Sequence, residues 1–210
     1  MRMRRKPNLE PRMEKCAHLI VAQPIKLRGE WLKGSGYDTL HVELGCGKGR
    51  FTAEIAKQAP GALLAALEKT ANVMVAALER AVREDVQNVR FVNALADFLP
   101  DYFAPDEVSR IYINFCDPWP TNRHAKRRLT GQRFLEIYKQ VLRPGGEIFF
   151  KTDNLPLFEF SLDEFKHCGF TLVEETRDLH KNGPVGVMTD YEERFHNRGI
   201  MINAAHIVLR

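Results

Sequence analysis

The segment Val42-Glu43-Leu44-Gly45-Cys46-Gly47-Lys48-Gly49 joins a short apolar run to three closely spaced glycines. Residues 39–45, TLHVELG, have the pattern of a short strand. The residues that follow the glycines place Phe51, Ile55 and Ala59 at helical spacing. Glycines between a strand and a helix let the backbone turn tightly and leave room for a ligand. The segment therefore predicts a strand, a turn and a helix, with a nucleotide-type site at the turn.

The spacing of the glycines distinguishes between kinds of cofactor. Gly45, Gly47 and Gly49 form a G-x-G-x-G pattern, whereas the dinucleotide fingerprint G-x-G-x-x-G needs Gly or Ala where this chain has Arg50. Glu68 ends the next apolar run, where a carboxylate can accept hydrogen bonds from both hydroxyls of an adenosine ribose. The pattern favours an adenosine cofactor and disfavours a nicotinamide dehydrogenase. A tight turn without a ligand is the plain alternative.

Apolar runs alternate with helical stripes along the rest of the chain. Strands are expected at 62–68, 89–94, 109–115, 147–153, 170–179 and 200–209. Helical stripes between them include Val75, Leu78 and Val82, then Phe134, Ile137, Tyr138 and Val141, and then Phe158, Leu162 and Phe165. Thr130 is the expected N-cap of the second of these helices, and Arg143-Pro144-Gly145-Gly146 is expected to end it. Residues 181–199 have the pattern of a polar loop.

This order of elements predicts the fold class. Strands that alternate with helices form parallel sheets covered on both faces, and two final strands with no helix between them imply one antiparallel strand. We therefore predict an α/β fold with a doubly wound, seven-stranded, mostly parallel sheet, one antiparallel strand and helices on both faces. Ligands of such sheets lie beyond the carboxyl ends of the strands.

Length and composition limit the class of protein. The 210 residues suit one globular domain, and no apolar run approaches the roughly 20 residues that cross a bilayer. The four cysteines form no C-x-x-C pair, so we expect a cytoplasmic protein without a structural metal. Residues 1–36 lack sustained periodicity and carry several prolines and glycines. We predict that they form a basic N-terminal arm or cap.

Positive charge is concentrated in two segments of an otherwise acidic chain. Residues 1–15 hold six basic and two acidic residues, and residues 121–133 hold five basic residues and no acid. The net charge of the whole chain is only +4, so the remainder is acidic. Such patches fit a nucleic-acid partner, although a charge run alone is usually a solvated face.

The fourth expected strand runs into Asn114-Phe115-Cys116-Asp117-Pro118-Trp119-Pro120, which alone could be a proline turn with a packed Trp. Together with VELGCGKG, RHAKRRLT at 123–130, KTDN at 151–154 and TDYEERF at 189–195, it resembles the bacterial tRNA (guanine-N7)-methyltransferase family over residues 40–210. The resemblance implies a class I, Rossmann-like S-adenosylmethionine-dependent domain in residues 37–210. It also implies methylation of guanine N7 in the variable loop of tRNA, at tRNA position 46.

The resemblance also implies roles for particular residues. The glycine turn and Glu43, Glu68, Asn93 and Asp117 would contact S-adenosylmethionine, and Asp153, Thr189 and Glu192 would contact the substrate. Two positions depart from the family pattern. Thr121 stands where Lys is common, so Arg123 or Lys126 would have to replace it, and Leu95 stands where an acid near the adenine is common.

The chemistry of guanine N7 supports the same reaction. N7 carries an unprotonated lone pair at neutral pH, so positioning should dominate its attack on a sulfonium methyl, with no general base. Asp117, the candidate catalytic residue, is suited to holding the base or to offsetting positive charge on the product. Trp119 could stack on an extruded base or simply pack under the loop. Phosphates beside the pocket could be held by Lys126, Arg127 and Arg128.

Two other functions fit the same residues. One is a methyltransferase for another RNA or a small substrate, and the other is a noncatalytic RNA-binding protein that keeps the cofactor pocket. A monomer and a homodimer are both compatible with the sequence, because neither a heptad repeat nor a distinct apolar patch can be identified in it.

Overall fold

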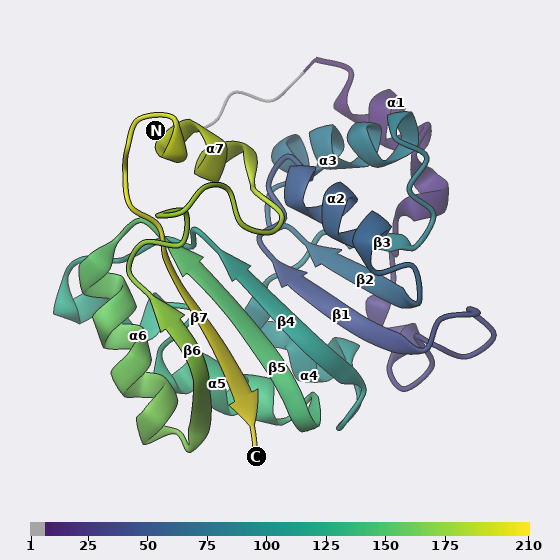
Figure 1. Ribbon diagram of the computed structural model, residues 1–210. Coiled ribbons are helices and arrows are strands. Elements are labelled where there is room, and N and C mark those ends of the chain that lie inside the picture. The colour runs from purple at the N-terminus through teal and green to yellow at the C-terminus, as the bar shows by residue number, and fades with distance from the viewer. Residues whose placement is uncertain (1–6) are drawn as a thin grey trace.

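Seven strands form one sheet in the computed structural model, which describes residues 7–210 (Figure 1). The strands are β1 (Thr39–Leu44), β2 (Ala62–Leu67), β3 (Val89–Val92), β4 (Val108–Asn114), β5 (Leu142–Thr152), β6 (Phe170–Thr176) and β7 (Asn203–Leu209). Their order is β3-β2-β1-β4-β5-β7-β6, and only β7 runs antiparallel to its neighbours. The predicted fold class is confirmed. The order reverses between β1 and β4, so the carboxyl ends of these two strands border the crevice where such sheets bind ligands.

Helices cover both faces of the sheet. They are α1 (Leu9–Glu14), α2 (Arg50–Gln58), α3 (Ala71–Arg83), α4 (Leu99–Tyr102), α5 (Gln132–Lys139), α6 (Leu155–His167) and α7 (Asp190–His196), with short 3-10 helices at Ala17–Leu19, Pro24–Leu27, Ala96–Phe98 and Asn122–Arg127. One core cluster packs α4, α5 and α6 against the sheet, and the other packs α2 and α3 against the opposite face. In Figure 1, α4 and α5 lie behind the sheet.

The strands contribute side chains to both core clusters, because successive side chains of a strand point to opposite faces of the sheet. In β1, Leu40, Val42 and Leu44 enter the cluster of α4, α5 and α6, which leaves Glu43 on the side of α2. In β2, alternate residues enter the two clusters, so every residue of that strand is buried. This double burial explains the almost continuous apolar run in β2.

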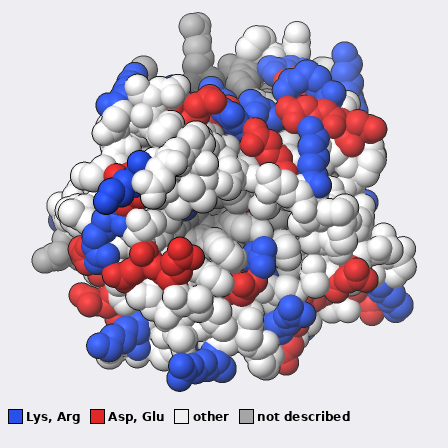
Figure 2. All heavy atoms as spheres, viewed as in Figure 1, with Lys and Arg blue, Asp and Glu red and all other residues white. Residues whose placement is uncertain are grey.

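Part of the sheet is not covered by a helix. On the face of β4, β5 and β7 that lies on the side of α2, a hollow of about 310 Å³ opens at the centre of Figure 2. Its floor includes Phe149, with His206 stacked on it at a ring-centroid distance of 4.3 Å. Arg110 and His206 both bond Glu147, so these three side chains on the exposed part of the sheet are paired with one another.

Four local predictions were wrong. Thr130 does not cap α5, because its hydroxyl lies 2.6 Å from Ser161 Oγ in the core, and Gly131 takes the N-cap position. Residues 143–146 lie within β5, at a register shift against β4, rather than at the end of a helix. Val82 is 45% exposed, and the buried stripe of α3 continues through Ala81 instead. The expected loop 181–199 contains α7.

Residues 7–36 pack first against α3 and β3 and then against α4 and the loop that follows it. Arg12 of α1 pairs with Glu79 of α3 at 2.6 Å, and Ile20 bridges to Phe91 of β3. Trp31 is buried, and its Nε1 donates to the Tyr102 carbonyl at 2.8 Å. The described part of the predicted arm thus packs on the domain. The domain boundary at residue 36 stays a prediction, and the basic residues within 1–6 lie outside the described residues.

Candidate functional site

The glycine turn after β1 combines two structural requirements. Gly45, Gly47 and Gly49 all have positive φ angles, of 80°, 58° and 78°, which favour glycine. A Cβ on Gly49 would lie 2.6 Å from Ala77 Cβ, so this glycine permits the close packing of α2 on α3. A Cβ on Gly45 would meet nothing within 4 Å, because Gly45 borders open space. The first glycine is therefore the one that faces a ligand cavity most directly.

Glu68 ties the turn to the end of β2. Its carboxylate accepts hydrogen bonds from the backbone N–H groups of Gly47, at 3.2 Å, and Thr70, at 2.9 Å. Asn93 is exposed, and its Nδ2 donates to the Glu68 carbonyl at 2.7 Å, which joins the ends of β2 and β3. The side chain of Glu68 is thus fixed at the sheet edge with carboxylate lone pairs left for a ligand.

A cavity of about 490 Å³ lies over the carboxyl ends of β1, β2 and β4. Glu68, Lys69, Asn114 and Asp117 provide its polar groups near the sheet, and Leu44, Leu67, Ala94 and Phe134 provide apolar walls. The remaining lining residues are Gly45, Leu95, Ala96, Asp97, Phe115, Cys116, Trp119, Arg127, Leu129 and Arg133. Three of the expected cofactor residues therefore meet at this cavity: Gly45, Glu68 and Asp117.

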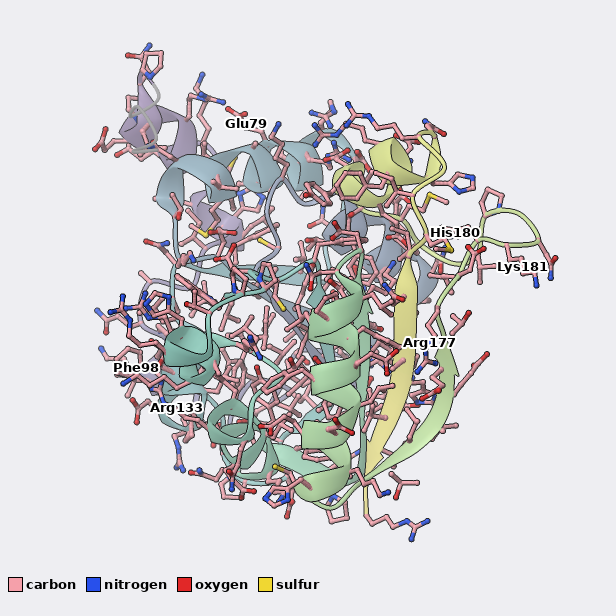
Figure 3. All side chains as sticks on the ribbon, turned by 90° about the vertical axis from the view of Figure 1, so that its left-hand side faces the viewer. Glu79, Phe98, Arg133, Arg177, His180 and Lys181 are labelled. Atoms are coloured by element: carbon pink, nitrogen blue, oxygen red, sulfur yellow. The ribbon has the colours of Figure 1, made fainter. Side chains whose placement is uncertain are left out.

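The far wall of the larger cavity carries an ion pair that the sequence reasoning missed. Asp97 pairs with Arg133 of α5 at 2.5 Å, and both side chains line the cavity. Figure 3 shows Arg133 beside Phe98 on the outer side of the molecule. Leu95 also lines this wall and is 45% exposed. Asp97 thus places an acid at this wall, two positions after Leu95, where the family pattern has one. Its closeness to Leu95 in the sequence was the signal that could have identified it.

The loop after β4 adopts a strained backbone. Phe115 and Trp119 have φ angles of 52° and 42°, in the left-handed region that costs a residue with a side chain roughly 1–2 kcal/mol. The Phe115 N–H continues the sheet by donating to the Lys151 carbonyl at 2.8 Å. Asp117 projects from this loop with 67% of its side chain exposed, 3.5 Å from Lys69. Such strain persists where the surrounding structure imposes it, often at functional sites.

The basic residues after this loop fall into two groups. Arg128 is only 9% exposed, and its guanidinium donates to the carbonyls of Pro118, at 3.1 Å, and Trp119, at 3.0 Å. Arg127 lies over the Trp119 ring at 4.9 Å and lines the larger cavity. Arg123 and Lys126 are exposed. Arg128 therefore holds the loop in place, whereas the other three cations face outward or toward the cavity.

A second cavity, of about 230 Å³, separates the glycine turn from α7. Glu43 lies at its base, 2% exposed, and accepts a hydrogen bond of 2.6 Å from Thr52 Oγ1. Burial raises the pKa of Glu43 to about 7, against the opposing effect of the Thr52 bond. Asn114 lines both cavities, and its Nδ2 is the one buried side-chain polar atom without a hydrogen-bond partner among residues 7–210, although the amide lies near enough to Glu43 to oppose the rise of that carboxyl's pKa. A buried amide donor of this kind indicates a ligand group between the two cavities.

The T-x-x-E string forms a capping box at the start of α7. Thr189 Oγ1 accepts from the Glu192 N–H at 2.9 Å, and the Glu192 carboxylate accepts from the Thr189 N–H at 3.2 Å. The Glu192 carboxylate is fully buried and also bonds Lys151, at 2.6 Å, and His180, at 3.0 Å. Burial lowers the pKa of Lys151, against the attraction of Glu192. Figure 3 shows His180 in the chain segment beside α7 and Lys181 pointing outward.

This arrangement separates the expected substrate residues. Thr189 lines the smaller cavity, whereas Glu192 lines neither cavity and anchors α7 to β5. Asp153, just after β5, lies close enough to Tyr191 that its charge, second to burial, raises the pKa of that phenol. The substrate contacts of these residues stay predictions.

Neither a metal cluster nor a membrane-spanning helix occurs in the described part of the chain. Residues 7–210 contain no group of three or more His, Cys, Asp or Glu side chains placed to hold a metal ion. The described helices are also too short or too polar to cross a bilayer. All four cysteines are unpaired, and burial raises the pKa of the Cys116 thiol to about 12, which fits a packing role.

The chain is similar to known proteins in sequence and in fold. A family model described as "Putative methyltransferase" matches residues 38–205. The tRNA (guanine-N(7)-)-methyltransferase of Bacillus subtilis (strain 168) is 42% identical over 212 residues, covering 100% of both chains. The solved structure of the 16S rRNA methyltransferase KamB matches with a TM-score of 0.65 at 19% identity, over 86% of this chain and 92% of its own. A 16S rRNA (adenine(1408)-N(1))-methyltransferase from Catenulisporales acidiphilia, solved with its cosubstrate SAM, matches with a TM-score of 0.61 at 14% identity, over 86% and 90%.

Proposed function

The chain belongs to the tRNA (guanine-N7)-methyltransferase family, and on that premise we propose that it methylates N7 of a guanine in the variable loop of tRNA, with S-adenosylmethionine as the methyl donor. The observation that carries the proposal is the full-length similarity, combined with two adjoining cavities at the switch point of the sheet. The donor would span the two cavities, and the base would meet its methyl group at their border.

The residues around the larger cavity fit S-adenosylmethionine. The Glu68 carboxylate is fixed where ribose hydroxyls can donate to it, and Asp97 offers an acceptor for the amino group of an adenine in place of Leu95. The partnerless Nδ2 of Asn114 would donate to the carboxylate of the methionine portion, and the buried Glu43 would face its ammonium group. Gly45 leaves the space that these contacts need.

The donor supplies a methyl group that is already activated by a positively charged sulfur. What the protein must add is the alignment of guanine N7 with that methyl group, because N7 needs no deprotonation. Asp117 lies on the rim of the larger cavity beside Lys69, exposed and able to reach a substrate. We assign it to holding the base donors N1–H and N2–H or to balancing the positive charge that forms on the base.

The exposed cations beside the larger cavity support an RNA partner. Arg123 and Lys126 are exposed on the 3-10 helix that follows the strained loop, and Arg127 covers Trp119. Phosphates held there would orient an extruded base toward the cavities. The four unpaired cysteines fit a reducing, cytoplasmic location.

Methyl transfer from labelled S-adenosylmethionine to unmodified tRNA transcripts tests this proposal, with chemical cleavage at N7-methylguanine used to locate the product. Cleavage at a single variable-loop guanine is expected. Incorporation without that cleavage would overturn the N7 assignment, and tRNA binding without incorporation would favour a noncatalytic protein. In the same assay, Asp117→Ala should lose most of the activity, whereas Asp163→Ala, an exposed acid on α6, should keep it.

A further inference from the structure

Two aromatic side chains from distant parts of the chain meet at the border of the two cavities. Phe115, from the strained loop, lines both cavities, and Tyr191, from α7, lines the smaller one. Their ring centroids are 5.4 Å apart with an interplanar angle of 55°, so they form one bent aromatic surface. Tyr191 is 45% exposed, so its ring is accessible to a ligand in the smaller cavity.

We propose that Phe115 and Tyr191 form an aromatic wall against which the target guanine stacks, and that this wall stabilises the positive charge created by N7 methylation. The inference rests on the proposed function and places the base at the border of the two cavities, between Phe115 and Tyr191, while the Glu43 end of the smaller cavity stays with the donor's ammonium group.

The wall is held in place from behind. Glu192, the residue after Tyr191, is buried and bonded to Lys151 and His180, so α7 cannot rotate without breaking a buried charged contact. On the far side of Tyr191, Phe195 packs edge to face at 4.3 Å. The Phe115 backbone is fixed by its bond to the Lys151 carbonyl. Both rings are thus ordered before any base arrives, which lowers the entropy cost of stacking.

The reaction moves a positive charge onto the base. The N7 lone pair forms a bond to the methyl carbon while the carbon–sulfur bond breaks, and its electron pair stays on sulfur. The donor sulfonium becomes a neutral thioether, and the guanine ring becomes cationic, with no proton transferred. An electron-rich ring face attracts a cation, so an aromatic wall favours the transition state over the neutral base. The Arg194 guanidinium lies 5.9 Å from the Tyr191 centroid and lines the same cavity, so the base would stack on the part of the ring that Arg194 leaves uncovered.

Steady-state methyl transfer by Tyr191→Phe and Tyr191→Leu tests the wall. Tyr191→Phe keeps the ring and should stay within about twofold of the wild type. Tyr191→Leu keeps apolar bulk without a π face and should lose about 10- to 100-fold in kcat/KM, with a fall in kcat because the charge develops in the transition state. Phe98→Leu is the control: Phe98 is 48% exposed, lines neither cavity and lies far from α7 (Figure 3).

Binding measurements distinguish stacking of the base on the aromatic wall from other roles of Tyr191. Inhibition by 7-methylguanosine 5′-monophosphate should exceed inhibition by guanosine 5′-monophosphate in the wild type, and Tyr191→Leu should remove this preference. Calorimetric binding of S-adenosylhomocysteine should be unchanged in all variants. Wild-type kcat/KM in Tyr191→Leu, equal losses in Tyr191→Phe and Tyr191→Leu, or a loss of S-adenosylhomocysteine binding would each overturn the wall. Failure of the proposed function is a different result, because the wild type itself would then not methylate tRNA.

Discussion

A buried carboxylate at position 43 is the site's main electrostatic cost. Glu43 is 2% exposed, and burial raises its pKa to about 7 from an ordinary value of 4.5. The folded state therefore binds a proton more tightly than the unfolded state does. Stability contributed by the neutral form is lost as pH rises from about 4.5 to 7, and the cost is complete above pH 7. We interpret this cost as the consequence of keeping a carboxylate ready for a cationic ligand.

Glu43→Gln should be more stable than the wild type at alkaline pH. The neutral amide can still accept the Thr52 hydrogen bond, and it avoids a desolvation cost of up to about 3 kcal/mol at pH 8. We expect Tm to rise by up to about 6–12 °C at pH 8 in calorimetry, with little difference near pH 4.5. Glu30→Gln, at an exposed surface pair, is the control and should show no pH-dependent gain. Equal stabilities for wild type and Glu43→Gln at pH 8 would contradict the buried charge.

Substitutions of Arg123 and Arg128 should have different effects on tRNA binding, catalysis and stability. Arg128→Ala removes two bonds that hold the Pro118–Trp119 loop and its stacking on Phe160, at 4.3 Å, so it should lower kcat for tRNA by about 10-fold or more and reduce stability by about 1–3 kcal/mol. Arg123→Ala, at an exposed position, should weaken tRNA binding and reduce the salt slope by about 1, with stability unchanged. Kinetics, thermal melts and binding at several salt concentrations measure the difference. The same profile in both variants would contradict the distinction.

At the scale of elements, α7 is held by ion pairs to other elements, of which only that of Glu192 is buried; those of Asp190 with Arg80 and Glu193 with Arg50 are more exposed. It spans only seven residues, and Glu192 connects it to Lys151 of β5 and to His180. Isolated helices of this length are unstable in water, so tertiary contacts must hold α7 over the smaller cavity. The arrangement keeps Thr189 and Tyr191 at the cavity while their neighbour stays buried.

Glu192→Ala should release α7 without unfolding the sheet. The change leaves Lys151 as a buried, unpaired cation, which costs about 3–5 kcal/mol when the partner is lost. Hydrogen exchange in residues 177–199 should accelerate strongly while β1, β2 and β4 stay protected, and methyl transfer should fall. Glu193→Ala, next along the helix, removes only a half-exposed pair with Arg50 and should show neither effect. Unchanged exchange in Glu192→Ala would contradict the anchoring role.

The elements that sequence reasoning found and those it missed differ in a physical way. Strands such as β1 and β2 are buried on both faces, so burial alone fixes their apolar runs, and they were predicted to within a residue or two. The α7 helix was missed because it has little apolar periodicity. Its signal was the capping box of Thr189 and Glu192, which the family resemblance led us to treat only as substrate contacts. Thr130 was wrongly predicted as an N-cap for the opposite reason. Its hydroxyl bonds Ser161 on α6, a tertiary contact that no local sequence pattern indicates.

For the whole molecule, the site joins groups that are far apart in the sequence. The glycine turn and Glu68 could be predicted because both lie in one strand–helix–strand unit with a known spacing. The ion pair of Asp97 with Arg133, and the contact of Phe115 with Tyr191, depend on tertiary packing between distant elements. These pairs could be identified only from the structure, in which the carboxyl ends of the parallel strands lie at one edge of the sheet.

In the proposed reaction, guanine N7 attacks a methyl group held at the border of the two cavities. The most direct test is methyl transfer to a tRNA transcript in which 7-deazaguanine, with a C–H in place of N7, replaces the variable-loop guanine. We predict that the substituted tRNA binds with nearly unchanged affinity and accepts no methyl group, while the unmodified transcript is methylated at that position. Methyl incorporation at the same rate in both transcripts would contradict attack by N7, because the attacking atom would then lie elsewhere.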